Sequence, residues 1–249
     1  MKTKYHIYNQ SFLNPIIGSF DQSGADIYTT AKKSSIKKFD FKRPGSYLPQ
    51  PVLYDFLINL VEDHGVDNLA SEFYPQMSLD ELGDFGGFIS ECNDMLTVIL
   101  DGIKYESIFQ TNTRMHLDVK GTVSRFSQFH LDPPSRGREL AEDIAFVMAL
   151  KAFKMVLGIN WNPNKLYVPR ESVQWIEKII DPNKVNVSYG HSNYAWDFDT
   201  KFLSHKNIGD SRTTTEPLIP DLNMSDRVIK ILESYKKSAT NIKTNLKKE

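Results

Sequence analysis

The sequence predicts an α+β fold, in which a helical N-terminal part is followed by a mainly antiparallel or mixed sheet with packed helices. Three observations lead to this fold class. Apolar residues recur at helical spacing over about the first hundred residues, they alternate with polar residues after residue 114, and the later segments follow in the order β-β-α-β-α-β-β. Strands connected partly by hairpins and partly by helices are typical of α+β layers rather than of a doubly wound parallel sheet.

The N-terminal part contains one clearly predicted helix. Pro51 suits its first turn and Gly65 its C-terminal stop. Between them, apolar residues recur at the i, i+3, i+4, i+7 spacing of an amphipathic helix. These residues are Leu53, Phe56, Leu57, Leu60 and Val61. A shorter helix is expected over residues 68–73, and the lysines of residues 32–38 are expected on a solvated face.

A glycine-rich turn follows this helical region. Residues 78–81 have the S-x-x-E spacing of a capping box, so a turn of helix is expected there. Gly83, Gly86 and Gly87 then allow backbone angles or close approaches that are closed to other residues. The next helix is expected from residue 95 to about residue 104.

After this helix, apolar residues recur at every second position, which is the repeat of a β-strand. Residues 114–119 alternate as a half-buried strand, residues 120–121 suit a hairpin turn, and residues 123–131 form the expected returning strand. Residues 138–157 predict a long helix that Gly158 ends. Apolar residues surround almost its whole circumference, so we expect this helix to be centrally buried.

The last predicted elements are short. Residues 166–168 are expected to form a strand and residues 172–180 a short helix. Residues 185–189 and 194–198 both alternate, and the turn residues between them predict a second hairpin.

Composition is that of an ordinary globular protein. The 249 residues are 40% hydrophobic and 24% charged, with a formal net charge of −1. This charge argues against extensive phosphate binding by the chain as a whole. A single cysteine, Cys92, excludes an internal disulfide and fits a reducing compartment. The N-terminus lacks the apolar region of a signal peptide, and no apolar run is long enough for a membrane span. We therefore expect a cytoplasmic protein without a membrane partner.

The enzyme motifs tested against the sequence are isolated or absent. Residues 84–86 spell D-F-G, but the other protein-kinase motifs do not accompany them. The six histidines never occur at H-x-H or H-x-x-x-H spacing, one cysteine cannot build a thiolate site, and neither a P-loop nor a dinucleotide fingerprint occurs. We expect no enzyme, no metal and no cofactor.

Two segments carry a family resemblance. They are L-G-D-F-G-G-F at residues 82–88 and W-N-P-N-K-L-Y-V-P at residues 161–169. Together they resemble the two signature regions of the effector-sensing, arabinose-binding-type N-terminal domain in one branch of AraC-type transcription regulators. The order of elements over roughly residues 15–236 also resembles that domain. The residues that carry the motifs are Gly83, Phe85, Gly86, Trp161 and Pro163.

The resemblance implies a division of the chain. Residues 1–222 would form the sensing domain, with a helical part to about residue 104, an α+β part over residues 105–203 and a linker over residues 204–222. Residues 223–249 would hold a linker or dimerisation helix leading to a DNA-binding domain that is absent from this sequence. The family normally continues into a helix-turn-helix domain, and no segment before Glu249 resembles one.

The implied function is ligand sensing. A small-molecule effector would control dimerisation or DNA-binding output, the protein would act as a homodimer, and it would reach DNA only through the absent domain. We therefore expect the chain alone to bind no specific duplex site. The alternative is a stand-alone small-molecule-binding or dimerisation protein with no DNA-binding domain.

The hairpin over residues 114–131 is the predicted ligand-facing surface. It places five polar or charged side chains among apolar neighbours, which suits an anionic or polar effector in a mostly apolar pocket. These residues are Arg114, His116, Arg125, Gln128 and His130. The alternative is that they form the solvent face of a one-sided antiparallel sheet.

Overall fold

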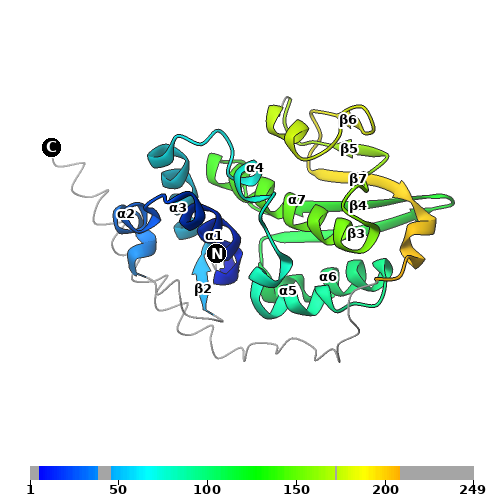
Figure 1. Ribbon diagram of the computed structural model, residues 1–249, viewed down its shortest axis with the longest axis horizontal. Coiled ribbons are helices and arrows are strands. Elements are labelled where there is room, and N and C mark those ends of the chain that lie inside the picture. The colour runs from blue at the N-terminus through cyan, green and yellow to red at the C-terminus, as the bar shows by residue number, and fades with distance from the viewer. Residues whose placement is uncertain (1–5, 39–45, 172, 208–249) are drawn as a thin grey trace, which may run out of the picture. The chain divides into compact units, whose positions relative to one another are not determined.

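The computed structural model of the protein describes residues 6–38, 46–171 and 173–207, all of which belong to one compact unit, His6–Pro217. Seven α-helices and seven strands in two sheets are formed by these residues (Figure 1). The α+β class is therefore confirmed. The expected helix near the C-terminus and most of the expected linker lie outside the described residues.

The helical part begins with a small two-stranded sheet. Strands β1 (Ile7–Asn9) and β2 (Tyr47–Pro49) pair antiparallel, and four helices accompany them. The helices are α1 (Asn14–Ser23), α2 (Ile27–Lys33), α3 (Gln50–His64) and α4 (Leu69–Phe73). Helix α3 has Pro51 in its first turn and ends at Gly65, whose φ of 62° lies in the left-handed region that glycine tolerates. Both boundaries agree with the sequence prediction.

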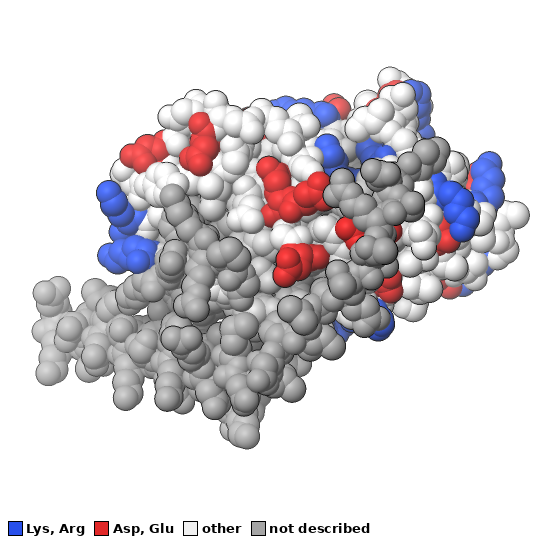
Figure 2. Space-filling model, turned by 60° about the horizontal axis from the view of Figure 1, so that its bottom comes forward, with Lys and Arg blue, Asp and Glu red and all other residues white. Residues whose placement is uncertain are grey.

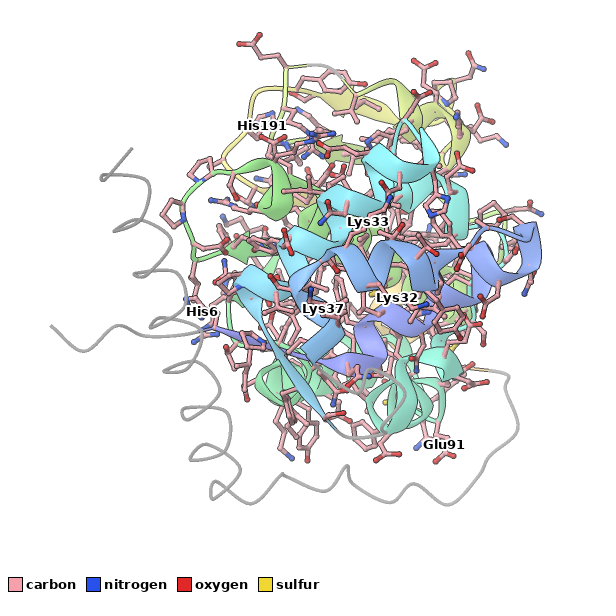
Figure 3. All side chains as sticks on the ribbon, turned by 90° about the vertical axis from the view of Figure 1, so that its left-hand side faces the viewer. His6, Lys32, Lys33, Lys37, Glu91 and His191 are labelled. Carbon is pink, nitrogen blue, oxygen red and sulfur yellow. The ribbon has the colours of Figure 1, made fainter. Side chains whose placement is uncertain are left out.

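The predicted lysine-rich face is solvated. Lys32 and Lys33 lie on α2 and Lys37 lies on the 3-10 helix η2 (Ser35–Lys38), and all three are exposed (Figure 3). Lys33 makes an ion pair with Asp63 at 3.1 Å. Such exposed pairs contribute little to stability, so this face is best explained as ordinary surface.

The glycine-rich region folds into two short consecutive helices. The 3-10 helix η3 (Leu79–Leu82) has the predicted capping box, in which the Glu81 carboxylate accepts a hydrogen bond from the Ser78 N–H at 3.1 Å. Helix α5 (Gly83–Ser90) follows immediately, and α6 (Met95–Phe109) comes next. Helix α6 runs past the expected end near residue 104, because Tyr105 and Phe109 continue its buried face.

The large sheet has the strand order β3-β4-β7-β5-β6. Strands β3 (Thr113–Lys120) and β4 (Val123–His130) form the predicted hairpin around Gly121, whose φ is 59°. Strand β7 (Tyr194–Asp199) pairs antiparallel with both β4 and β5 (Lys165–Tyr167), while β6 (Asn186–Ser188) pairs parallel with β5.

The expected hairpin between β6 and β7 is therefore wrong, since β5 lies between these strands. The loop after β6 hydrogen-bonds to the segment that follows β5: Gly190 N–H donates to Arg170 and His191 N–H to Val168, both at 3.0 Å. Strand β7 has Tyr194, Ala195 and Trp196 all buried. Strand β7, with these three buried side chains, therefore lies inside the sheet and not at its edge.

Helix α7 (Arg136–Leu157) packs along the inner face of this sheet (Figure 1). Its Phe146 stacks on Tyr194 with ring centres 4.5 Å apart, and its Phe153 meets Trp196 edge-on at 5.1 Å. Central burial of the long helix is thus confirmed. The predicted helix over residues 172–180 is instead the 3-10 helix η4 (Gln174–Lys178), because Val173 has an extended backbone and leaves only a short turn.

The described chain ends against helix α6. After the 3-10 helix η5 (Thr200–Ser204), the His205 carbonyl accepts from the Met95 N–H at 3.0 Å, and Lys206 pairs with Asp94, the residue that caps α6. The first residues of the expected linker are thus bound to the domain. None of the helices described is both long and apolar enough to cross a membrane.

Candidate ligand-binding site

A cavity of about 70 Å³ lies between helices α5, α6 and α7 and the inner face of the β3–β4 hairpin. Its walls are almost entirely apolar. The lining residues are Leu79, Leu82, Phe85, Gly86, Ile89, Val98, Ile99, Gly102, Phe109, Gln110, Met115, Phe126, Gln128, Ala145, Met148, Ala149, Ala152 and Phe153.

Small side chains leave this space between the helices. Helix α7 presents Ala145, Ala149 and Ala152 to the cavity at the spacing of one helical face, and α6 presents Gly102. A Cβ atom added at Gly102 would meet no atom within 4 Å. The cavity therefore follows from residue sizes on two packed helices.

Gly86 has a different role, because it permits a close approach of two backbones. A Cβ atom there would lie 1.8 Å from the Leu79 carbonyl oxygen and 2.8 Å from the Leu82 Cβ. Only glycine lets α5 lie against η3 at this separation. The glycine predicted from sequence to allow a close approach does so, and it forms part of the cavity wall.

Two buried amides supply the polar groups of the cavity. Gln110 is 2% exposed and Gln128 is 3% exposed, and the side-chain oxygen of each is buried without a hydrogen-bond partner. A buried acceptor without a partner destabilises the fold by about 1–3 kcal/mol. A ligand that hydrogen-bonds these amides would recover that free energy.

A buried carboxyl group lies beside the cavity. Glu106 is on the same face of α6 as Gly102 and Phe109, and its Oε2 accepts from the Met115 N–H at 3.1 Å. Burial raises the pKa of Glu106 above its ordinary value. This contact ties the last turns of α6 to the strand that carries Met115, so it positions two walls of the cavity.

The five predicted ligand-facing residues divide between the two faces of the sheet. Residues paired across antiparallel strands share a face, and the register pairs Met115 with Gln128 but Asp118 with Arg125. Gln128 therefore lines the cavity, and His130 lies further along the same inner face. Arg114, His116 and Arg125 lie on the outer, solvated face. The five side chains do not form one site.

His130 is enclosed without polar contacts. Both of its ring nitrogens are buried and have no hydrogen-bond partner. Burial lowers the pKa of His130 to about 3, so the imidazole is neutral near pH 7.

Arg125 takes part in an outer-face network. Its guanidinium pairs with Asp197 at 2.6 Å and donates to the Tyr167 hydroxyl at 2.6 Å. Partial burial raises the pKa of Asp197, but hydrogen bonds from Arg125 and Tyr167 outweigh it and lower that pKa overall. These groups satisfy one another on the solvent side, as the one-sided sheet alternative predicts.

The remaining motif residues form or support the cavity walls. Phe85 stacks on Phe109 with ring centres 4.9 Å apart, and both rings line the cavity. Trp161 is 8% exposed and stacks at 5.4 Å on Phe153, another lining residue, and Pro163 is buried nearby in the sequence. Gly83 joins η3 to α5 with a φ of 66°. Phe85 and Gly86 of the first motif thus line the candidate site, and Trp161 of the second motif packs behind it.

Gln110 is the site residue that sequence reasoning missed. It follows Phe109, the last residue of α6, and lies six positions beyond the helix end that was expected near residue 104. A longer buried face through Phe109 was the signal that could have located it.

A larger polar cleft of about 590 Å³ lies between α3, the start of α4, α7 and η4. Its most buried charge, Asp143, is fully engaged. Asp143 accepts from Arg170, from the Tyr194 hydroxyl at 2.7 Å and from Asn68 at 2.7 Å, while Arg136 pairs with Glu62 at 2.6 Å outside the lining. Among the buried polar atoms without a partner in the described residues, none belongs to this cleft. The smaller apolar cavity is therefore the stronger candidate site.

Metal and thiol chemistry find little support in the part of the chain that is described. There, no group of three or more His, Cys, Asp or Glu side chains is placed to hold a metal ion. Burial raises the pKa of the Cys92 thiol to about 12, which keeps it protonated near pH 7.

The fold and the cavity define a class: an α+β domain with an apolar pocket beneath an antiparallel hairpin. No protein-family model matches the chain, and no curated protein sequence matches it significantly. A solved structure with a similar fold is the transcriptional regulator CdpR from Pseudomonas aeruginosa, with a TM-score of 0.53 and 12% sequence identity. The match covers 78% of this chain and 56% of CdpR, so the chain spans little more than half of that structure. At this identity, the likeness shows a shared fold.

Proposed function

We propose that this chain is the ligand-sensing domain of an AraC-type transcription regulator and that the cavity beneath the β3–β4 hairpin binds its effector. The observation that carries the proposal is the apolar cavity with two buried amide oxygens that have no partner. The motif residues Phe85 and Gly86 line this cavity, and Trp161 packs behind it. The fold shared with part of the transcriptional regulator CdpR supports the same proposal.

The junction around Gln110 offers a route from ligand to conformation. Gln110 forms an isolated bridge with Tyr8, and the next residue, Thr111, donates its N–H to the Ile7 carbonyl at 3.0 Å. A ligand that moves the Gln110 side chain would therefore act on the contact between α6 and β1. Regulation requires that the effector bind one arrangement of this contact more tightly than another.

The rest of the proposal follows the family resemblance. The regulator would act as a homodimer in the cytoplasm, and it would contact DNA through a further domain. The alternative is a small-molecule-binding or dimerisation protein with no role in transcription.

The experiment compares transcripts in native cells that carry the gene, lack it, or carry a cavity-filling Gly102→Leu variant. Helical Gly102 has free space at its Cβ, so the larger side chain enters the cavity. We expect Gly102→Leu to change the transcripts that deletion changes, and an exposed control, Lys32→Ala, to leave them as in wild type. Circular dichroism of the purified variants checks that both are folded.

Two outcomes would contradict the proposal in different ways. If deletion changes no transcript, the protein is not a transcription regulator and the alternative is favoured. If deletion changes transcripts but the folded Gly102→Leu variant behaves as wild type, the cavity is not the effector site.

A further inference from the structure

The chemistry of the cavity walls restricts the ligand, and this argument rests on the proposed function of the same cavity. Of the eighteen lining residues, only Gln110 and Gln128 have polar side chains, and none is charged. An ion placed there would lose its hydration without gaining a counter-ion, which is strongly unfavourable. The walls therefore select an uncharged ligand.

The surroundings also disfavour an anion. The basic side chains of the hairpin, Arg114 and Arg125, lie on the opposite face of the sheet. The buried ionisable group nearest the cavity along α6 is the carboxyl of Glu106. An anion there would gain no counter-charge from the cavity walls, and it would be repelled to the extent that Glu106 is ionised.

The helices that wall the cavity carry negative charge on their outer sides. Residues 80–103 contain six Asp or Glu and no Lys or Arg. They span η3, α5 and the first half of α6. In Figure 2, which brings the α5–α6 side of Figure 1 forward, acidic side chains are grouped near the middle of the view. Lys104 lies just beyond this segment and Lys206 pairs with Asp94, but the remaining carboxylates still disfavour the approach of an anion to this side.

The two amides define the polar part of the ligand. Each has a buried side-chain oxygen that no donor satisfies. A hydroxyl group provides one donor and two acceptor positions, and an amide provides both an acceptor and donors. One hydroxyl between the two glutamines can donate to the side-chain oxygen of one and accept from the Nε2–H₂ group of the other, while the second oxygen needs a further donor.

The volume sets the size of the apolar part. The cavity, at about 70 Å³, is smaller than the 150 Å³ of an engineered protein cavity that binds benzene. Met115 and Met148 line it, and the flexible thioether side chain adapts readily to shape. A short aliphatic chain fits these walls better than a large ring system.

We infer that the effector is a small, uncharged, mostly apolar molecule with at least one hydroxyl group, which hydrogen-bonds the side chains of Gln110 and Gln128. Of the anionic or polar effectors that the hairpin sequence suggests, this class keeps the polar, uncharged ones.

The test uses three probes of equal chain length, 1-butanol, butyrate and butylammonium, at pH 7.5. Each is titrated into the purified chain whose methionine methyl groups carry ¹³C, and the NMR signals of Met115 and Met148 report the cavity directly. We expect 1-butanol to shift these two signals with a Kd at least about tenfold lower than either ion, a difference of about 1.4 kcal/mol.

The glutamines are tested with Gln128→Leu, with Gln110→Leu as a second variant. We expect each to weaken 1-butanol about tenfold while the affinity for 1-chlorobutane, which has similar shape and no hydroxyl, stays within about twofold. The matched control is Gln76→Leu, an exposed glutamine after α4. It should leave both affinities unchanged.

The possible failures are distinct. Tighter binding of butyrate or butylammonium at Met115 and Met148 would overturn the ligand class while leaving the cavity as a binding site, and the transcript experiment would still decide the proposed function. The inference is also overturned if 1-butanol shifts neither signal, or if the two glutamine variants bind it as tightly as wild type does.

Discussion

The backbone contact at Gly86 gives the sharpest prediction about stability. In Gly86→Ala, the added Cβ would lie 1.8 Å from the Leu79 carbonyl oxygen, whereas real Cβ atoms essentially never approach closer than 3.0 Å. Helix α5 and η3 would therefore have to separate by at least about 1.2 Å, and both elements line the cavity. Backbone atoms cannot rotate away as a flexible side chain can, so the strain has no local escape.

The neighbouring Gly87 is a matched control in the same helix. A Cβ atom there would meet nothing within 4 Å. Overpacking typically lowers the free energy of unfolding by about 1–3 kcal/mol. Because the clash at Gly86 is with backbone, we expect Gly86→Ala to lose about 3 kcal/mol, the upper end of this range. Gly87→Ala should instead stabilise by about 0.5–1 kcal/mol, because alanine favours the helix.

The assay is thermal unfolding of wild type and both variants by circular dichroism, with urea unfolding as a second measure. At roughly 2–4 °C per kcal/mol for a domain of this size, Gly86→Ala should lower Tm by about 6–12 °C and Gly87→Ala should raise it by about 1–4 °C. Equal Tm values for the two variants would refute the close-approach argument.

Two further predictions concern buried rings. Trp161→Ala should destabilise the domain by about 3 kcal/mol or more, because the ring is buried against Phe153; a Tm within about one degree of wild type would contradict this. Burial lowers the pKa of His130 from 6.5 to about 3, so below pH 6.5 the unfolded chain binds a proton that the folded protein does not, and stability falls as the pH drops. The raised pKa values of Glu106 and Glu142 make stability rise as the pH drops, which opposes the effect of His130. The quantity to measure is therefore the difference in unfolding free energy between wild type and the His130→Asn variant. Between pH 6.5 and 4.5, wild type should lose about 2 kcal/mol more unfolding free energy than the variant, and parallel pH profiles would contradict the assignment.

The sequence alone determined the features that depend on near neighbours in the chain. Gly65 ends α3, the capping box over residues 78–81 begins η3, and Gly121 turns the β3–β4 hairpin, as predicted. Each involves a hydrogen bond or a backbone angle set within a few residues. The alternation of residues 114–119 likewise identified a strand with two different faces, because successive side chains point to opposite sides.

Contacts between distant residues decided the rest. A short alternating strand does not encode its partners, so sequence could not place β5 between β6 and β7; burial of Tyr194, Ala195 and Trp196 did so. The alternation of apolar and polar residues in the hairpin likewise does not identify which of its two faces the helices cover.

The candidate site depends on both levels. Local sequence signals led to Phe85, Gly86 and Gln128, but the cavity exists only where α6 and α7 place small residues opposite them. Gln110 joins the site because α6 continues to Phe109, a boundary that buried tertiary contacts set and that helix periodicity does not. The chain's local chemistry determined its elements, and packing between elements distant in sequence decided which of their side chains share a cavity.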